Sequence, residues 1–415
     1  MSRGIVILIV IILIDLYAYQ AFRVAWSGKS DLFQRIGFFV YWGLTFLSIG
    51  CVVAANISDW KLWPHQWRIF LFSFVFILTA SKLFIIPFLL VDDLQRFFRW
   101  VASLIAEPKT KPVFTYEGRG ITRAKFLSLM GIIIAAIPFS SLLFGMIKGP
   151  YDFTVRRLKL STPRLPGNFN GLKILQISDL HIGSWKSEKP LKRALKLILE
   201  QNADLILFTG DLVNDMASET DEYLEILSQI KAPLGVYSIL GNHDYGDYVN
   251  WPTRNAKIEN LENLKNVHKK IGWKLLLNEH DKITVKEEEL TILGVENWSS
   301  RRGFQKYGNI TEAYKGLKPE DFKILMTHDP THWSAVISKE YDDIDVTFAG
   351  HTHGFQYGVR LPSFQWSPVQ YVYDHWMGLY KVASQYLYVN PGLGFIGYPG
   401  RVGIMPEITV VELSR

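Results

Sequence analysis

The most constraining feature of the sequence is the uneven distribution of apolar residues, which concentrate in the first 150 of its 415 positions. Four stretches there, residues 4–22, 36–56, 67–91 and 126–147, approach or exceed the length of about 20 helical residues that crosses a bilayer. Because lipid offers the backbone no hydrogen-bond partner, a segment that crosses it must be a helix or part of a closed barrel. We therefore predict an all-α transmembrane domain of four helices in residues 1–150.

The first apolar stretch has one alternative interpretation, the apolar part of a secretory signal. It carries Asp15, continues through Tyr17 and Tyr19, and lacks a clear small-residue cleavage site, which favours a retained helix. Asp15 and Lys82 lie inside apolar segments, where ionisable residues are functional candidates by default. The simpler interpretation is that Lys82 extends toward an interface and that Asp15 pairs either with Lys82 or with the backbone of a neighbouring helix.

The distribution of Lys and Arg indicates which side of the membrane each domain faces. The segment after the first helix carries three basic residues and the segment from Arg96 to Lys125, after the third, carries seven. Since cytoplasmic segments are enriched in Lys and Arg, we expect a multi-pass cell-membrane protein with an extracytoplasmic C-terminal domain. A basic cluster from Lys148 to Arg164 opposes this orientation, unless it lies against anionic headgroups. The single cysteine, Cys51, leaves the compartment open.

Residues 151–415 show a different pattern, in which short apolar runs are each followed by a polar patch. The five patches are Asp179-Leu-His181, Gly210-Asp211, Gly241-Asn-His-Asp244, His328 and Gly350-His-Thr-His353. Short apolar runs closed by glycine or polar residues are typical of buried strands, and open α/β sheets bind ligands beyond the carboxyl ends of their strands. We therefore expect all five patches to converge on one sheet edge. Later runs, around residues 290–295, 378–382, 385–389 and 408–413, predict a second sheet.

The patches contain the ligand types that a two-metal hydrolytic centre requires. Two divalent ions about 3.5 to 4 Å apart share a ligand, and a carboxylate such as Asp211 can bridge them. Imidazoles and a neutral amide oxygen can complete the two coordination shells. The residues that fit this role are His181, His328, His351, His353 and Asn242. Imidazole suits zinc and iron while carboxylate suits manganese, so ligand type alone does not identify the metal.

In this order along the chain, the motifs D-x-H, G-D, G-N-H-D, H and G-H-T-H resemble those of the calcineurin-like metallophosphoesterase superfamily. The resemblance covers residues 152–415, and the run 165–183 is similar to a subgroup of membrane-anchored bacterial phosphoesterases. It implies an α/β fold, a four-layer α/β/β/α sandwich of two sheets in residues 151–415, preceded by the helical transmembrane domain.

The same resemblance implies the chemistry and the ligand sets. Two divalent ions, of Mn, Fe or Zn, would activate water to hydrolyse a phosphoester or pyrophosphate bond. One ion would be held by Asp179, His181 and His353 and the other by Asn242, His328 and His351, with Asp211 bridging them. His243 would act as the general acid that protonates the leaving oxygen.

Two positions depart from the family pattern. Asn214 stands where the phosphoprotein phosphatases have an acid that orients the catalytic histidine, so Asp215 or Asp244 could orient His243 instead. Phe355 replaces a glycine after the last motif, which suggests a modified loop on the substrate side. No arginine has the spacing with which phosphatases grip a phosphomonoester, and protein phosphatase activity is therefore disfavoured.

The remaining histidines are given structural roles. His332, four residues after His328, is interpreted as a capping or surface residue, and orientation toward the site is the alternative. Histidines that match no motif are assigned to surface or membrane-interface positions. They are His65, His268, His280 and His375.

Aromatic residues are dense in two segments near the motifs, and they bear on the substrate. They are Tyr245, Tyr248, Trp251, Tyr357, Phe364, Trp366, Tyr371, Tyr373, Trp376 and Tyr380. They could form a lid at the membrane interface that admits a lipid headgroup, or half of them could be strand-core residues. The membrane domain favours the bilayer as partner and a phospholipid, glycolipid pyrophosphate or related diester as substrate.

The alternatives are a nuclease or cyclic-nucleotide-type phosphodiesterase and an inactive membrane scaffold or sensor. A nucleic-acid partner is disfavoured because the basic residues cluster at membrane edges rather than along one stripe. The sequence does not indicate an oligomeric state.

Overall fold

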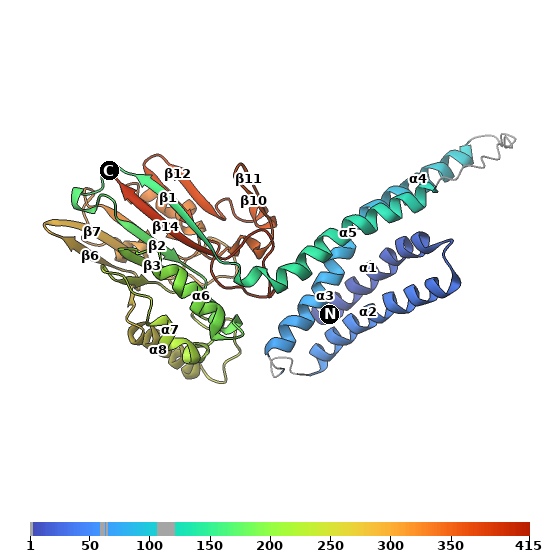
Figure 1. Ribbon diagram of the computed structural model, residues 1–415, viewed down its shortest axis with the longest axis horizontal. Helices are drawn as coiled ribbons and strands as arrows, with labels where there is room; N and C mark the ends of the chain where they lie inside the picture. The colour runs from blue at the N-terminus through green and yellow to red at the C-terminus, as the bar shows by residue number, and fades with distance from the viewer. Residues whose placement is uncertain (1–2, 59–62, 64, 106–120) are drawn as a thin grey trace. The chain divides into compact units, whose positions relative to one another are not determined.

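The computed structural model describes residues 3–58, 63, 65–105 and 121–415. The chain divides into two compact units, Met1–Phe144 and Gly145–Arg415. The first unit is helical and the second is built on β-sheets (Figure 1).

Long apolar helices make up the described part of the first unit. They are α1 (Arg3–Trp26), α2 (Asp31–Ile57), α3 (His65–Leu83), α4 (Ile86–Ile105) and α5 (Arg123–Ile147). Four spans are long and apolar enough to cross a membrane. These spans are Gly4–Trp26, Asp31–Ile57, Trp67–Ile105 and Arg123–Ile147.

The third span differs from the single helix predicted over residues 67–91, because it is interrupted between α3 and α4. Pro87 is the second residue of α4, and proline has no amide hydrogen to continue the helical ladder. The amides of Phe84 and Ile85 instead bond the carbonyls three residues earlier. Since α4 then continues to Ile105, the basic residues Arg96 and Arg99 are helical rather than in a loop.

The other basic residues of that segment bear on the predicted orientation. Lys109, Lys111 and Arg119 lie outside the described residues. The side of the membrane therefore stays a prediction.

The predicted pairing of Asp15 with Lys82 is confirmed. The Lys82 ammonium forms an ion pair with Asp15 Oδ1, and both side chains are buried. The same ammonium lies 4.6 Å from the centre of the Tyr41 ring. The hydroxyl of Tyr41 donates to the backbone carbonyl of Asp15 at 2.8 Å. The two charges thus compensate each other inside an apolar bundle, where either alone would be costly.

Replacing Lys82 with methionine is expected to lower the stability of the helical unit by about 3–5 kcal/mol, because it leaves the Asp15 carboxylate buried without a partner. The double variant Asp15→Leu/Lys82→Met removes both charges and should recover much of that loss. Thermal unfolding in detergent would measure both effects. A single variant as stable as the wild type would show that the ion pair contributes nothing.

Two six-stranded mixed sheets form the second unit. The first has the order β1-β14-β2-β3-β4-β5 and the second the order β12-β13-β9-β8-β7-β6. The strands of the first sheet are β1 (Thr154–Ser161), β14 (Glu407–Ser414), β2 (Lys173–Ile177), β3 (Leu205–Phe208), β4 (Val236–Ser238) and β5 (Lys274–Leu275). Those of the second are β12 (Gly378–Val382), β13 (Gln385–Val389), β9 (Val346–Ala349), β8 (Lys323–Met326), β7 (Glu288–Gly294) and β6 (Glu279–Val285).

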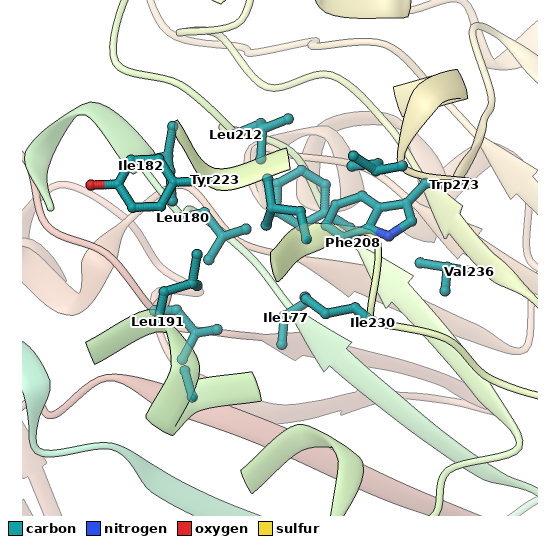
Figure 2. Close-up of a cluster of buried hydrophobic side chains, with 14 of the residues drawn as sticks. Ile177, Leu180, Ile182, Leu191, Phe208, Leu212, Tyr223, Ile230, Val236 and Trp273 are labelled. Atoms are coloured by element: carbon teal, nitrogen blue, oxygen red, sulfur yellow. The ribbon is translucent and has the colours of Figure 1, made fainter. Parts of the chain in front are cut away.

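Helices cover the outer face of each sheet, which gives the predicted four layers. The helices over the first sheet are α6 (Glu188–Leu199), α7 (Leu224–Leu227) and α8 (Arg254–Lys270), and those over the second are α9 (Ile310–Tyr314) and the helical segment η6 (Trp333–Ile337). Side chains of β2 point to both faces of the first sheet. Ile174 packs between the two sheets, whereas Leu175 and Ile177 pack beneath the helices. Figure 2 shows the core beneath the helices of the first sheet, to which both Leu191 of α6 and Ile177 of β2 belong. The α/β/β/α sandwich is confirmed.

The assignment of residues 408–413 to the second sheet is wrong. This run lies in β14, which pairs in parallel with β1 and antiparallel with β2 in the first sheet. An apolar run indicates that a strand is buried but does not specify its partner, since the partner is chosen by packing.

Two histidines outside the motifs are buried, which contradicts the surface positions predicted for them. His268 is fully buried and its Nδ1 lies 3.0 Å from Ser238 Oγ. His332 is buried against the ring of Trp298, and its Nδ1 lies 3.0 Å from Thr327 Oγ1. Each imidazole has one polar partner, which lets it sit within an apolar core.

The burial of His268 predicts a loss of stability in acid. Burial lowers its pKa from 6.5 to about 3, so below pH 6.5 the unfolded chain binds a proton that the folded protein excludes. The contribution of neutral His268 to the free energy of unfolding is therefore fully present above pH 6.5 and is lost as the pH drops toward 3. The free energy of unfolding should be about 2 kcal/mol lower at pH 5. Thermal unfolding at pH 7 and pH 5 should show a smaller acid shift in His268→Gln. Equal shifts in the variant and the wild type would contradict this.

Candidate metal centre

The five polar patches meet where the carboxyl ends of the two sheets lie side by side. Three patches follow β2, β3 and β4 of the first sheet, and two follow β8 and β9 of the second. The expectation that they converge on the edge of one sheet is therefore wrong. Each strand does present its patch at its carboxyl end, but apolar runs alone could not reveal that a second sheet supplies half of the site.

An unusual backbone places these side chains. Left-handed φ values occur at Asp179 (50°), His181 (43°), Asp211 (59°), His351 (74°) and His353 (51°). This region is unfavourable for residues other than glycine, and such strain concentrates at functional sites. The strain turns successive side chains of a loop toward one point.

One glycine allows the two sheets to approach each other at this point. A Cβ atom at Gly350 would lie 2.0 Å from Ser178 Oγ and 2.4 Å from Asp179 Oδ2. The loop after β9 can therefore contact the loop after β2 only if residue 350 has no side chain. The amide of the next residue, His351, then donates to the Asp179 carboxylate at 3.1 Å.

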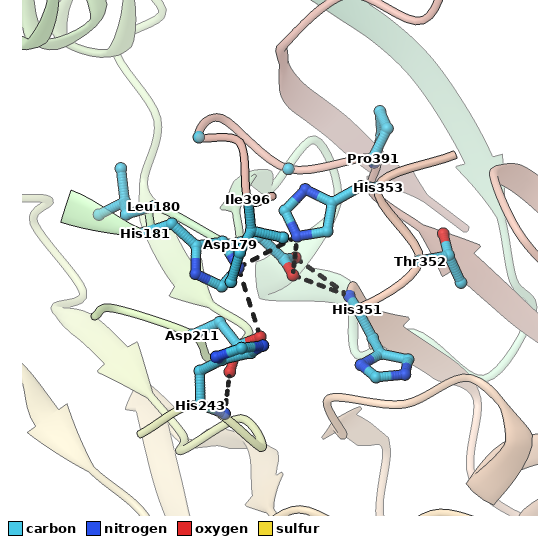
Figure 3. Close-up of polar contacts among 12 residues, drawn as sticks. Asp179, Leu180, His181, Asp211, His243, His351, Thr352, His353, Pro391 and Ile396 are labelled. Atoms are coloured by element: carbon cyan, nitrogen blue, oxygen red, sulfur yellow. Dashed lines mark hydrogen bonds and ion pairs between the residues drawn. The ribbon is translucent and has the colours of Figure 1, made fainter. Parts of the chain in front are cut away.

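The first cluster of candidate ligands contains Asp179, His181 and His353, whose ligand atoms all lie within 4.8 Å of one another. The Nε2 atoms of His181 and His353 are 3.1 Å apart, and His353 Nε2 lies 3.3 Å from Asp179 Oδ1. Figure 3 shows these three side chains converging. Only one of two facing imidazole nitrogens can donate a hydrogen bond, whereas a cation held between them satisfies both.

The second cluster contains Asp211, His328 and His351. His328 Nε2 lies 3.1 Å from Asp211 Oδ2, and His351 Nδ1 lies 2.8 Å from the amide oxygen of Asn242. The same Asp211 Oδ2 is 3.5 Å from His181 Nε2 of the first cluster. Asp211 thus lies between the two clusters, in the position that a bridging ligand requires.

Neighbouring groups hold the imidazole rings in orientation. His328 Nδ1 donates to the carbonyl of Thr209 at 2.7 Å, which directs Nε2 toward Asp211. His351 Nε2 lies 2.9 Å from Tyr373 Oη, which leaves Nδ1 beside Asn242. Such contacts fix the tautomer and direction of metal-binding histidines.

The electrostatics of the two clusters differ. Burial lowers the pKa of His181 to about 3 and that of His351 to about 4, and it lowers the pKa of His353 as well. These rings are neutral near pH 7 and have a lone pair to offer a metal. Burial also opposes the charged form of His328, but the charges of Asp211 and Asp179 raise its pKa to about 10. The donor set of carboxylates, imidazoles and one amide fits two divalent cations.

His243 lies beside the clusters and belongs to neither. Its backbone amide donates to Asp211 Oδ1 at 2.8 Å, and its Nδ1 donates to the carbonyl of Asn214 at 2.7 Å. The ring centres of His243 and His181 are 4.9 Å apart. Because Nδ1 is engaged, Nε2 is the nitrogen left for proton exchange.

The carbonyl of Asn214 orients His243 in place of the acid found in the phosphoprotein phosphatases. The contact is a backbone carbonyl, which any residue at position 214 supplies. The carboxylate of Asp244 is turned away and accepts from the amides of Asp211, Leu212 and Gly241 at 2.9, 2.8 and 2.8 Å. Asp244 therefore shapes the loop that carries Asp211.

Three residues near the clusters were not identified as site residues from the sequence. Tyr248 Oη accepts from Asn242 Nδ2 at 2.9 Å, and Tyr373 contacts His351 as described above. Both belong to the aromatic segments. The density of aromatic residues indicated that these segments matter, but it did not indicate which tyrosines contact the ligands. Arg401 is fully buried and its Nη2 lies 3.3 Å from His353 Nδ1. No pattern in the sequence marks this arginine.

The aromatic segments divide between core and surface. Tyr245, Tyr373 and Trp376 are buried, whereas Tyr248, Phe364 and Tyr371 are exposed. The buried residues lie in loops rather than in strands, and the lid at the membrane interface stays a prediction for the exposed residues.

Comparison with known proteins identifies relatives for both units. Residues 2–150 match a family described as "Probable Calcineurin-like phosphoesterase, transmembrane domain", and residues 172–355 match "Calcineurin-like phosphoesterase". The chain is 31% identical over 270 residues to "Uncharacterized metallophosphoesterase YkuE" of Bacillus subtilis, covering 64% of this chain and 87% of that protein.

Two further relatives have more specific names. "Transmembrane protein with metallophosphoesterase domain" of Danio rerio is 27% identical over 297 residues, which cover 69% of this chain and 63% of that protein. This chain thus spans less than two thirds of that relative. "UDP-2,3-diacylglucosamine pyrophosphatase LpxG" of Chlamydia trachomatis is 26% identical over 310 residues, covering 63% of this chain and 89% of that protein.

Proposed function

Because this chain belongs to the calcineurin-like metallophosphoesterase family of hydrolases and carries a transmembrane domain, we propose that it hydrolyses a phosphoester or pyrophosphate bond in a lipid-linked substrate. The observation that carries the proposal is the position of Asp211 Oδ2, within 3.1 Å of His328 Nε2 and 3.5 Å of His181 Nε2. One carboxylate oxygen reaching a ligand of each cluster is the arrangement of a dinuclear centre.

The ligands divide into two sets that share Asp211. Asp179, His181 and His353 would hold one ion, and Asn242, His328 and His351 would hold the other. Bound divalent ions of this kind polarise the phosphoryl group and lower the pKa of water. Their identity, Mn, Fe or Zn, is left open by a mixed oxygen and nitrogen donor set.

His243 supplies the proton that the leaving oxygen needs. The carbonyl of Asn214 holds the proton on Nδ1, so the proton that is exchanged with the substrate resides on Nε2. This is general-acid catalysis, in which the protonated imidazole donates as the bond to phosphorus breaks.

A lipid-linked substrate is favoured by two observations. The membrane domain keeps the catalytic domain beside a bilayer, and one similar protein is named as a pyrophosphatase of a diacylated sugar nucleotide.

The excess of Lys and Arg in the first and third connecting segments favours an extracytoplasmic catalytic domain. Accessibility of an engineered cysteine in intact cells would test that placement.

The proposed function is tested by incubating the reconstituted wild type and Asp211→Asn with total membrane lipid extract and a divalent metal. Mass spectrometry should find a phosphate-containing lipid that only the wild type consumes. A lipid profile that is the same with both proteins, together with turnover of cyclic nucleotides or nucleic acid, would favour the phosphodiesterase alternative.

A further inference from the structure

A small hairpin beside the site exposes its apolar side chains and is anchored by one of its polar side chains. β10 (Val359–Leu361) and β11 (Phe364–Trp366) pair with each other outside both main sheets. Val359 and Leu361 alternate onto one face of the hairpin, and Phe364 joins them as the cross-strand partner of Leu361. Leu361 is 56% exposed and Phe364 is 54% exposed.

The opposite face of the hairpin is attached to the domain by charge. Arg360 forms an ion pair with Glu407, which is fully buried at the start of β14. A hairpin packed on a protein core normally buries its apolar face and exposes its polar face. In this hairpin the apolar face is turned outward and the charged face inward. Transfer of the outward face from water to an apolar environment would therefore be favourable.

Phe355 extends this surface toward the metal centre. It lies two residues after His353, is 56% exposed, and has a left-handed backbone with φ of 59°. A side chain with a Cβ is unfavourable in that conformation, and exposure of the ring to water adds nothing to stability. Neither the backbone conformation nor burial in a core therefore explains a phenylalanine at this position. We call Phe355, Val359, Leu361 and Phe364 the apolar rim.

Contacts within the second unit connect the base of the hairpin to the end of α5. The amide of Gly358 donates to the carbonyl of Val402, and the amide of Val402 donates to the carbonyl of Gln356, at 2.9 and 2.8 Å. The neighbouring Arg401 amide donates to the carbonyl of Gly145 at 3.2 Å. A Cβ at Gly149 would lie 2.0 Å from the Arg401 carbonyl oxygen, so this packing is close.

These contacts place the base of the hairpin close to the residues that end α5. Gly145 lies in the last turn of α5, which ends at Ile147 and is long and apolar enough to cross a membrane. The base of the hairpin is thus separated from the emerging chain only by the segment Arg401–Val402. Exposed apolar side chains at such a position are typical of an interfacial membrane contact.

We propose that the apolar rim inserts into the interfacial region of the bilayer in which α1–α5 are anchored. Its position next to His353 lets a lipid phosphoester pass from the membrane to the metal centre with its acyl chains in apolar contact. The route for the substrate rests on the proposed function, whereas the membrane contact does not depend on catalysis.

The membrane contact is tested by fluorescence in the full chain. Cys51 is the single cysteine, so Cys51→Ser with Leu361→Cys gives one labelling site for an environment-sensitive dye. The matched control carries the dye through Leu199→Cys on α6, where Leu199 is 44% exposed. In phosphatidylcholine vesicles with brominated acyl chains, we expect quenching of the dye at position 361 and none at position 199.

Two outcomes would overturn the proposal. The first is a dye at position 361 that is as insensitive to brominated lipid as the control. The second is a dye whose emission depends on the protein-to-lipid ratio and not on bromination, which would mean that a second copy of the chain covers the rim.

The substrate route has a separate kinetic test. Phe355→Gly removes a rim side chain at a backbone position that glycine favours, so folding is retained, and thermal unfolding verifies this. We expect the ratio of turnover of a long-chain alkyl nitrophenyl phosphodiester in vesicles to that of a soluble aryl phosphodiester to fall about tenfold in Phe355→Gly and in Leu361→Ser. Leu199→Ser should leave the ratio unchanged.

The kinetic outcomes separate the two proposals. An unchanged ratio in both rim variants would overturn the substrate route. Absence of turnover with either substrate in the wild type would refute the proposed function, while the fluorescence result would still decide the membrane contact.

Discussion

Asp211→Asn is expected to lower kcat by about 10³-fold or more while the protein remains folded. The Asp211 carboxylate is the group whose Oδ2 approaches both His328 Nε2 and His181 Nε2, at 3.1 and 3.5 Å. Asparagine offers one neutral oxygen, which can neither bridge two cations nor balance their charge. Metal content per chain should fall together with turnover of a soluble aryl phosphodiester.

A control separates the loss of the bridge from a general loss of charge. Asp342 is exposed and outside the site, so Asp342→Asn should keep both metal content and turnover. Thermal unfolding of Asp211→Asn should stay cooperative. If Asp211→Asn bound metal and turned over substrate like the wild type, Asp211 would not be a bridging ligand.

His243→Ala is expected to lower kcat by about 10²- to 10⁴-fold with the metal content unchanged. The side chain belongs to neither ligand cluster, and its contact with Asp211 is made by the backbone amide, which alanine retains. The loss should be large for an alkyl phosphoester and small for a nitrophenyl ester, because a nitrophenolate leaves without needing a proton. Steady-state kinetics with the two esters, beside metal analysis, would measure this.

The matched control for His243→Ala is His181→Ala, which removes an imidazole of the first cluster. We expect that variant to lose metal, and to lose activity toward both esters alike. If His243→Ala lost metal to the same extent, His243 would be a ligand rather than an acid. Full activity in His243→Ala would remove it from the mechanism.

The lengths of the apolar segments and the order of the motifs carried most of the correct predictions. A long apolar run has few folded alternatives because lipid-buried amides must be bonded within the segment. Short apolar runs ending in ligand residues likewise predicted the strands that precede the motifs, among them β2, β3, β8 and β9. The interruption before Pro87 was less evident, because proline can either bend a helix or end it.

The sequence by itself determined that the chain has a membrane-spanning part and a two-sheet phosphoesterase part, and which residue types were available as ligands. These properties are local, since they depend on the length of an apolar run and on the residues that close it. Only the tertiary structure decided which sheet each strand joins, that Asp211 lies between two clusters supplied by both sheets, and that a backbone carbonyl orients His243. It also decided which aromatic residues are buried and which form the exposed rim. Such properties depend on contacts between residues far apart in the chain, and no local pattern encodes them because packing selects the partner.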